Sequence, residues 1–239
     1  MNVENQNLIV TDSETYRLEA LSVEFLQILP ILFLFFIFYT SKDALLSLLL
    51  YELFLIAIPL IYLKFQAKTQ LKPFFQPLFM QNWRNSVIYG IPISISIYFV
   101  CFGLFSWIFA SQVQYLITYQ FLFPHNEVLY IMIFPIFTLV NPFLSEIYWR
   151  IIPLNTVKKP NKIRMCFYYG FFHGLVVYIL KDSLNGLLFF AVYTALAWFF
   201  TFLKEKGNII TAIFAHIGLN LSLSIAFILI INEQRKVFS

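Results

Sequence analysis

Charged residues are scarce in this chain. They make up 12% of its 239 residues, whereas a soluble domain carries roughly 25%. Hydrophobic residues account for 60% and aromatic residues for 20%. This balance excludes an ordinary soluble protein and predicts an all-α, polytopic transmembrane helical bundle whose first partner is the lipid bilayer. No polar stretch is long enough to form a separate soluble domain.

Cysteine is also scarce. The chain has 2 cysteines, Cys101 and Cys166, and both lie inside apolar runs. They therefore predict small buried side chains and exclude a disulfide framework or a cysteine-based metal site. The N-terminal stretch 1–22 is polar and acidic and lacks the basic start of a signal peptide. We expect it to be retained as a polar tail in front of one membrane-embedded domain, residues 23–239.

Long apolar runs are what the chain has in abundance. A helix needs about 20 apolar residues to span the hydrocarbon core of a membrane. Prolines at 135 and 142 predict kinks in the fourth run. The runs predict about seven spans, at 23–40, 44–63, 86–110, 127–150, 165–180, 183–203 and 208–231.

Seven spans place the loops alternately on two sides of the membrane. One side then holds 12 of the 16 basic residues, and the other holds Lys42, Lys181, Arg235 and Lys236. The positive-inside rule predicts a cytoplasmic N-terminus, with the plasma membrane as the default location. Basic and aromatic residues alternate in loop 64–85. This pattern is typical of an interfacial loop, and we expect no nucleic-acid partner.

Ionisable side chains within the spans predict one site. Glu146 and Arg150 are four residues apart, as are His216 and Asn220, so each pair shares a helix face. His173 lies nine residues after Arg164, and His216 lies ten after Lys206, which gives both histidines a similar depth. Ionisable groups inside a membrane usually face the bundle interior. We therefore expect the three segments to form one polar cavity.

The residues flanking His173 add to this picture. Tyr169 precedes His173 by four residues and shares its face, and Gly170 and Gly174 bracket it. Small residues at this spacing let membrane helices approach closely. Asn141 is expected to form an interhelical hydrogen bond. Glu52 lies alone within the second span, where it either pairs with a site residue or lines a path.

The order of these motifs resembles the CPBP family of intramembrane proteases, also called the Abi or CAAX-protease family. The family pattern is Glu-Glu-x-x-x-Arg, then Phe-x-x-x-His, then His-x-x-x-Asn or Asp, on successive helices. The counterparts in this chain are Ser145-Glu146-x-x-x-Arg150, Tyr169-x-x-x-His173 and His216-x-x-x-Asn220. The resemblance covers roughly 131–224, within a core at about 127–231.

The resemblance implies an endopeptidase that cleaves a membrane-associated protein or peptide with activated water. His173 would assist water activation beside Glu146, which Arg150 would hold, and His216 and Asn220 would stabilise the oxyanion. It also implies catalysis without a cofactor. Zinc is the alternative, with Glu146 and both histidines as ligands, although the chain has no His-Glu-x-x-His stretch.

Position 145 separates the functional hypotheses. The family has a glutamate there as the presumed base, and this chain has Ser145, for which no activating base is evident. Either Glu146 takes over as base, or the protein is an inactive pseudoprotease that serves as a membrane scaffold or binding protein. A small transporter with Glu52, Glu146 and the histidines as a proton relay is the third hypothesis.

Overall fold

The computed structural model describes residues 13–41, 44–66, 83–110, 134–156, 160–180, 183–206 and 209–238. Most of the predicted tail 1–22 and of the predicted loop 64–85 lies outside these residues, as does the start of the fourth predicted span. The long helices are α1 (Ser13–Ser41), α2 (Ala44–Ile61), α4 (Trp83–Ala110), α9 (Lys162–Leu180), α10 (Ser183–Glu205) and α11 (Ile209–Phe238). A π-helical turn, η1 (Tyr62–Gln66), extends α2.

One further helix is built from short pieces in direct succession, and we call it the central helix. Its pieces are η2 (Ile136–Val140), α7 (Asn141–Glu146), η3 (Ile147–Ile151) and α8 (Ile152–Thr156), of which η2 and η3 are π-helical. With this helix, each predicted span corresponds to a helix of the described structure. The prediction of an all-α bundle is therefore confirmed.

Three of the described helices are long and apolar enough to cross a membrane. They cover Trp83–Trp107, Ser183–Glu205 and Ile209–Ala226. Their presence identifies an integral membrane protein, whereas the total of about seven spans stays a prediction. Cys101 and Cys166 are both buried and free, as predicted.

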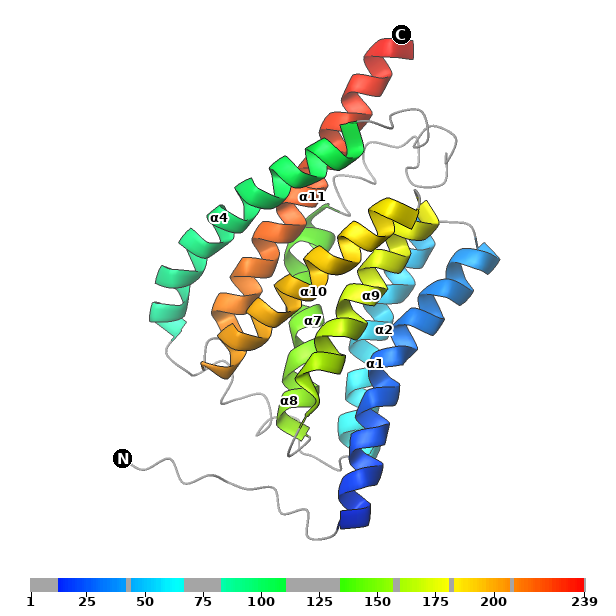
Figure 1. Cartoon of the computed structure of the whole chain (residues 1–239), viewed down its shortest axis with the longest axis vertical. Helices are drawn as coiled ribbons and strands as arrows, with labels where there is room; N and C mark the ends of the chain where they lie inside the picture. Colours follow the sequence, from blue (N-terminus) through cyan, green and yellow to red (C-terminus); the bar gives the residue numbers. More distant parts are fainter. Residues whose placement is uncertain are drawn as a thin grey trace.

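The helices alternate in direction through the bundle (Figure 1). Helix α11 contacts α4 on one side and α10 on the other, α10 contacts α9, and α9 contacts α1. The central helix contacts both α2 and α11. It therefore lies where side chains from early and late parts of the chain meet.

Glycines set the spacing of α9 and α10. A Cβ atom at Gly170 would lie 1.9 Å from the hydroxyl oxygen of Thr194, and one at Gly174 would lie 2.7 Å from the Cβ of Phe190. Neither distance is tolerable, so these two positions require glycine for the close approach of the helices. This confirms the packing role predicted for the glycines that bracket His173.

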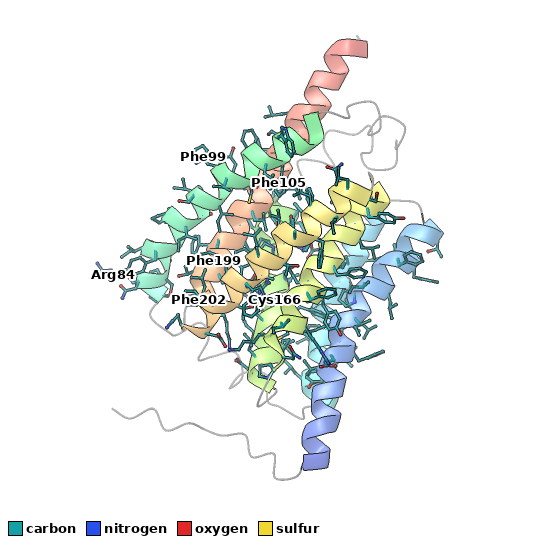
Figure 2. All side chains as sticks on the ribbon, in the orientation of Figure 1. Arg84, Phe99, Phe105, Cys166, Phe199 and Phe202 are labelled. Atoms are coloured by element: carbon teal, nitrogen blue, oxygen red, sulfur yellow. The ribbon has the colours of Figure 1, made fainter. Side chains whose placement is uncertain are left out.

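Helix α4 is the most exposed of the long apolar helices. Figure 2 shows the side chain of Phe99 on the outer side of α4, and this residue is 66% exposed. On its inner side α4 meets α11 so closely that a Cβ at Gly218 would lie 2.2 Å from the carbonyl oxygen of Ser94. An apolar outer surface on such a helix suits contact with lipid.

The central helix continues past its predicted end. The fourth predicted span ends at Arg150, and helical structure runs on through η3 and α8 to Thr156. Arg150 lies within η3 and is only 1% exposed, so it belongs to this helix and not to the loop that follows. Without Arg150 the basic residues of that side still number 11 against 4 on the other, and the orientation stays a prediction.

Candidate active site

Two π-helical segments position the polar residues of the central helix. The backbone N–H of Asn141 donates to the carbonyl of Ile136, and the N–H of Ile152 donates to that of Ile147, five residues back in each case. The ring of Pro142 would clash with the carbonyl four residues before it in a regular helix. The wider turn just before Pro142 relieves this clash. Short π segments of this kind often occur at functional sites.

Glu146 lies at the centre of the first polar cluster. Its side chain is 0% exposed, and its Oε1 accepts a hydrogen bond of 2.9 Å from Nη1 of Arg150. Nδ1 of His216 on α11 lies 2.9 Å from the same oxygen. A carboxylate only accepts hydrogen bonds, so Nδ1 of His216 is the donor. The predicted pairing of Glu146 with Arg150 is confirmed, and the pair reaches across to α11.

Tyr169 completes this first cluster from α9. Its hydroxyl lies 3.3 Å from Nε2 of His216. The guanidinium carbon of Arg150 lies 4.3 Å from the centre of the Tyr169 ring and 5.1 Å from that of Phe200. Aromatic faces attract cations when water is excluded. The buried Arg150 is thus held by one carboxylate and two rings, and its charge balances that of Glu146.

Two atoms of the buried ion pair are left over. Oε2 of Glu146 and Nη2 of Arg150 are both buried, and neither has a hydrogen-bond partner among the described residues. Buried polar atoms are normally satisfied by protein or by ordered water. The pair therefore offers an acceptor and a donor to water or to a peptide group.

His173 lies in an aromatic environment. Its ring stacks on that of Tyr193, with 4.0 Å between centroids and 22° between planes, and it meets the edge of Tyr169 at 4.6 Å. Among the described residues, its imidazole makes no hydrogen bond to Glu146, which differs from the predicted carboxylate–histidine pair. The helices place His216 against the carboxylate instead. His173 as a whole residue is partly buried.

Asn220 and Asn141 form a second polar cluster beside the first. Nδ2 of Asn220 donates to Oδ1 of Asn141 over 3.0 Å and to the carbonyl of Phe137 over 2.9 Å. The hydroxyl of Ser145 lies 3.5 Å from the same Oδ1. Asn141 therefore makes the interhelical hydrogen bond predicted for it, and Ser145 lies at the edge of the cluster.

Glu52 joins the second cluster from α2. Its Oε1 accepts a hydrogen bond of 2.7 Å from Nδ2 of Asn141. This partner could not be predicted from the sequence, because Glu52 and Asn141 are 89 residues apart in the chain. The only signal available was a lone carboxylate in an apolar span, which predicts an interior partner without identifying it.

The described part of the chain offers little to a metal ion. Within it, no three histidine, cysteine, aspartate or glutamate side chains come together in a way that would hold one. Catalysis without a cofactor stays a prediction that follows from the family resemblance. The catalytic roles assigned to individual residues likewise stay predictions, although Glu146, Arg150, Tyr169 and His216 do meet in one place.

Comparison with known proteins supports the resemblance. Residues 127–222 match the family model described as type II CAAX prenyl endopeptidase Rce1-like. This match confirms the resemblance to the CPBP family for that part of the chain, which contains Glu146, His173 and His216. No curated protein and no solved structure matches the chain. Glu52 lies outside the matched residues.

Proposed function

We propose, from the match of residues 127–222 to the Rce1-like endopeptidases, that this protein is an intramembrane endopeptidase of the CAAX or bacteriocin-processing type. It hydrolyses a peptide bond of a membrane-associated protein or peptide, with water activated in the polar site. The observation that carries the proposal is the buried contact of Glu146 with Arg150 and His216. A charged group inside a membrane bundle is costly and usually serves a function.

Glu146 and Arg150 prepare His216 for its role. The carboxylate accepts the hydrogen on Nδ1, which fixes the orientation of the ring and favours its positively charged form during reaction. His216 and Asn220, one turn apart on α11, then donate to the oxygen of the peptide carbonyl as negative charge develops there. Asn220 donates to two carbonyl oxygens at present, and the substrate oxygen would replace one of them.

His173 contacts the attacking water in this proposal. In the described part of the chain, the contacts of its ring are with aromatic side chains, which leaves its nitrogens for water. The aromatic contacts with Tyr193 and Tyr169 hold the plane of the ring. An imidazole held in this way can orient water and pass a proton, which contributes about 10²–10⁴-fold to a rate.

The orientation in the membrane is part of the proposal. The N-terminus faces the cytoplasm of a plasma membrane, with the ends of α8 and α10 on the same side. Lys204 near the end of α10 donates to Asn155 of α8, and Glu205 pairs with Lys162 at the start of α9. Reporter domains fused at either end of the chain test this orientation.

A specific observation also favours an inactive pseudoprotease. Ser145 stands where the family has its presumed catalytic glutamate, and its buried hydroxyl lies near Asn141 rather than a base. Such a protein would bind a membrane segment without cutting it. In that case the buried polar clusters would serve recognition alone.

Profiling of new protein termini distinguishes the two functions. Membranes from cells expressing the wild type, His173→Ala and Ser145→Glu are compared at equal protein levels. We expect termini that appear with the wild type and vanish with His173→Ala. Termini that appear only with Ser145→Glu would instead identify a pseudoprotease with a preserved site. No difference among the three would remove the support for an enzyme.

A further inference from the structure

We propose that Glu52 supplies the second carboxylate of this site and takes the place of the glutamate that is missing at position 145. This inference rests on the proposed endopeptidase function and names the group that accepts the proton from water. Glu52 lies on α2, outside the matched residues 127–222 and well before them in the chain.

The contacts of Glu52 lead directly to position 145. Its Oε1 accepts from Nδ2 of Asn141, at 2.7 Å, and Oδ1 of the same asparagine lies 3.5 Å from the hydroxyl of Ser145. The carboxylate is therefore one side chain away from the position where the family has its first glutamate. Asn141 also accepts from Asn220, at 3.0 Å, which connects Glu52 to the proposed oxyanion donor.

The second oxygen of Glu52 is available for chemistry. Glu52 is only 6% exposed, and its Oε2 is buried without a hydrogen-bond partner among the described residues. None of the described ion pairs involves Glu52. A buried carboxylate without a cation is costly, and a glutamine would accept the same bond from Asn141 without that cost. A structural role alone therefore does not explain a glutamate here.

The two carboxylates of the site differ in their charge environment. Glu146 neutralises Arg150 and is engaged as its counter-ion. Glu52 has a neutral amide as its partner. Of the two carboxylates, Glu52 is therefore the one that is not engaged as a counter-ion. In the proposed site, Glu146 therefore orients His216, and Glu52 accepts the proton from water.

Helices α2 and α9 contact each other one residue before Glu52 and His173. The ring of Tyr51, the residue before Glu52, stacks on Phe172, the residue before His173, with 5.0 Å between centroids. Helices α2 and α9 are thus in contact at the level of both groups.

The reaction step consumes one water molecule. The water oxygen bonds to the carbonyl carbon of the peptide, and one of its protons passes to the carboxylate of Glu52. The carbon–nitrogen bond then breaks, and this proton leaves with the amine. The other proton stays on the new carboxyl group, so Glu52 returns to its charged form.

The test compares Glu52→Gln with Glu52→Gln/Ser145→Glu in the profiling of termini that depend on His173. Glutamine keeps the acceptor for Asn141 and removes the base. We expect Glu52→Gln to slow the appearance of these termini by about 100-fold or more, within the range of general-base catalysis. We expect the double variant to recover cleavage, because it restores a carboxylate at the family position.

Two controls keep folding and chemistry apart. Gln27→Met replaces another buried polar side chain, on α1, whose Nε2 has no partner among the described residues; it should leave cleavage unchanged. Membrane yield and unfolding temperature of each variant, measured in detergent, check that the protein is folded. A folded Glu52→Gln protein is required for the comparison, and Glu52→Asp serves as the conservative variant if it is not.

Each outcome has a distinct meaning. Cleavage by folded Glu52→Gln at the wild-type rate overturns the inference while leaving the proposed function intact. Loss of cleavage that Ser145→Glu does not restore overturns the claim that Glu52 replaces the missing glutamate. Absence of any termini that depend on His173 overturns the proposed function and the inference together.

Discussion

Removal of Arg150 tests whether the buried ion pair is a stabilising unit. We choose Arg150→Met, because methionine keeps an unbranched apolar stem between Tyr169 and Phe200. The substitution leaves Glu146 buried at 0% exposure with no cation beside it. Breaking a buried pair by removing one partner typically costs about 3–5 kcal/mol. We expect a loss of this size in the free energy of unfolding.

The assay is reversible unfolding in mixed detergent micelles, followed by tryptophan fluorescence. Trp149, adjacent to Arg150, is buried and reports on this part of the bundle. The matched comparison is the double variant Glu146→Gln/Arg150→Met, which removes both charges. It should be more stable than Arg150→Met alone, because no unpaired charge remains.

Two results would refute this reasoning. Arg150→Met with a stability within about 1 kcal/mol of the wild type would mean that water reaches Glu146 and solvates it. The single variant Glu146→Gln completes the comparison. If the stability lost by the double variant equals the sum of the losses of Arg150→Met and Glu146→Gln, the two side chains do not interact in the folded protein.

Three further predictions follow from the contacts of the site and its helices. Gly174→Ala should destabilise the protein by about 1–3 kcal/mol through overpacking, whereas Gly103→Ala, whose Cβ would meet nothing within 4 Å, should be neutral in the same unfolding assay. Tyr169→Phe loses the 3.3 Å contact with His216 and should cost about 0.5–1.5 kcal/mol with cleavage retained; loss of cleavage would make the hydroxyl essential. Asn220→Leu should slow cleavage by about 10²–10³-fold as an oxyanion donor is lost, and unchanged termini would exclude that role.

Contacts within one helix could be predicted from the sequence. A spacing of four residues places two side chains on one face, so Glu146 with Arg150 followed from the sequence. The same logic applied to the glycines around His173, whose missing side chains permit the close approach of α10. The helices themselves followed from the apolar runs, since a membrane requires every backbone polar group to be satisfied internally.

Contacts between helices could not be predicted in the same way. Whether Glu146 meets His173 or His216 depends on the rotation of each helix about its axis, and the answer was His216. The bond between Glu52 and Asn141 depends on the position of α2 against the central helix. The spacing of residues along the chain gives neither the rotation of a helix nor its position against another helix. The burial of Arg150 beside its own counter-ion was likewise outside the reach of the sequence, where an arginine at the end of an apolar run is a usual sign of the membrane surface.

The π-helical segments on either side of α7 give the protein a means of evolutionary adjustment. Each residue of a helix turns the chain by about 100°, so loss of one residue from η2 would rotate Asn141 and Glu146 together relative to what precedes them. A compensating gain in η3 would return α8 to its former setting. Compensating changes in the two π-helical segments would therefore rotate the six residues of α7 about the helix axis. The direction of their side chains would change while the surrounding helices keep their positions.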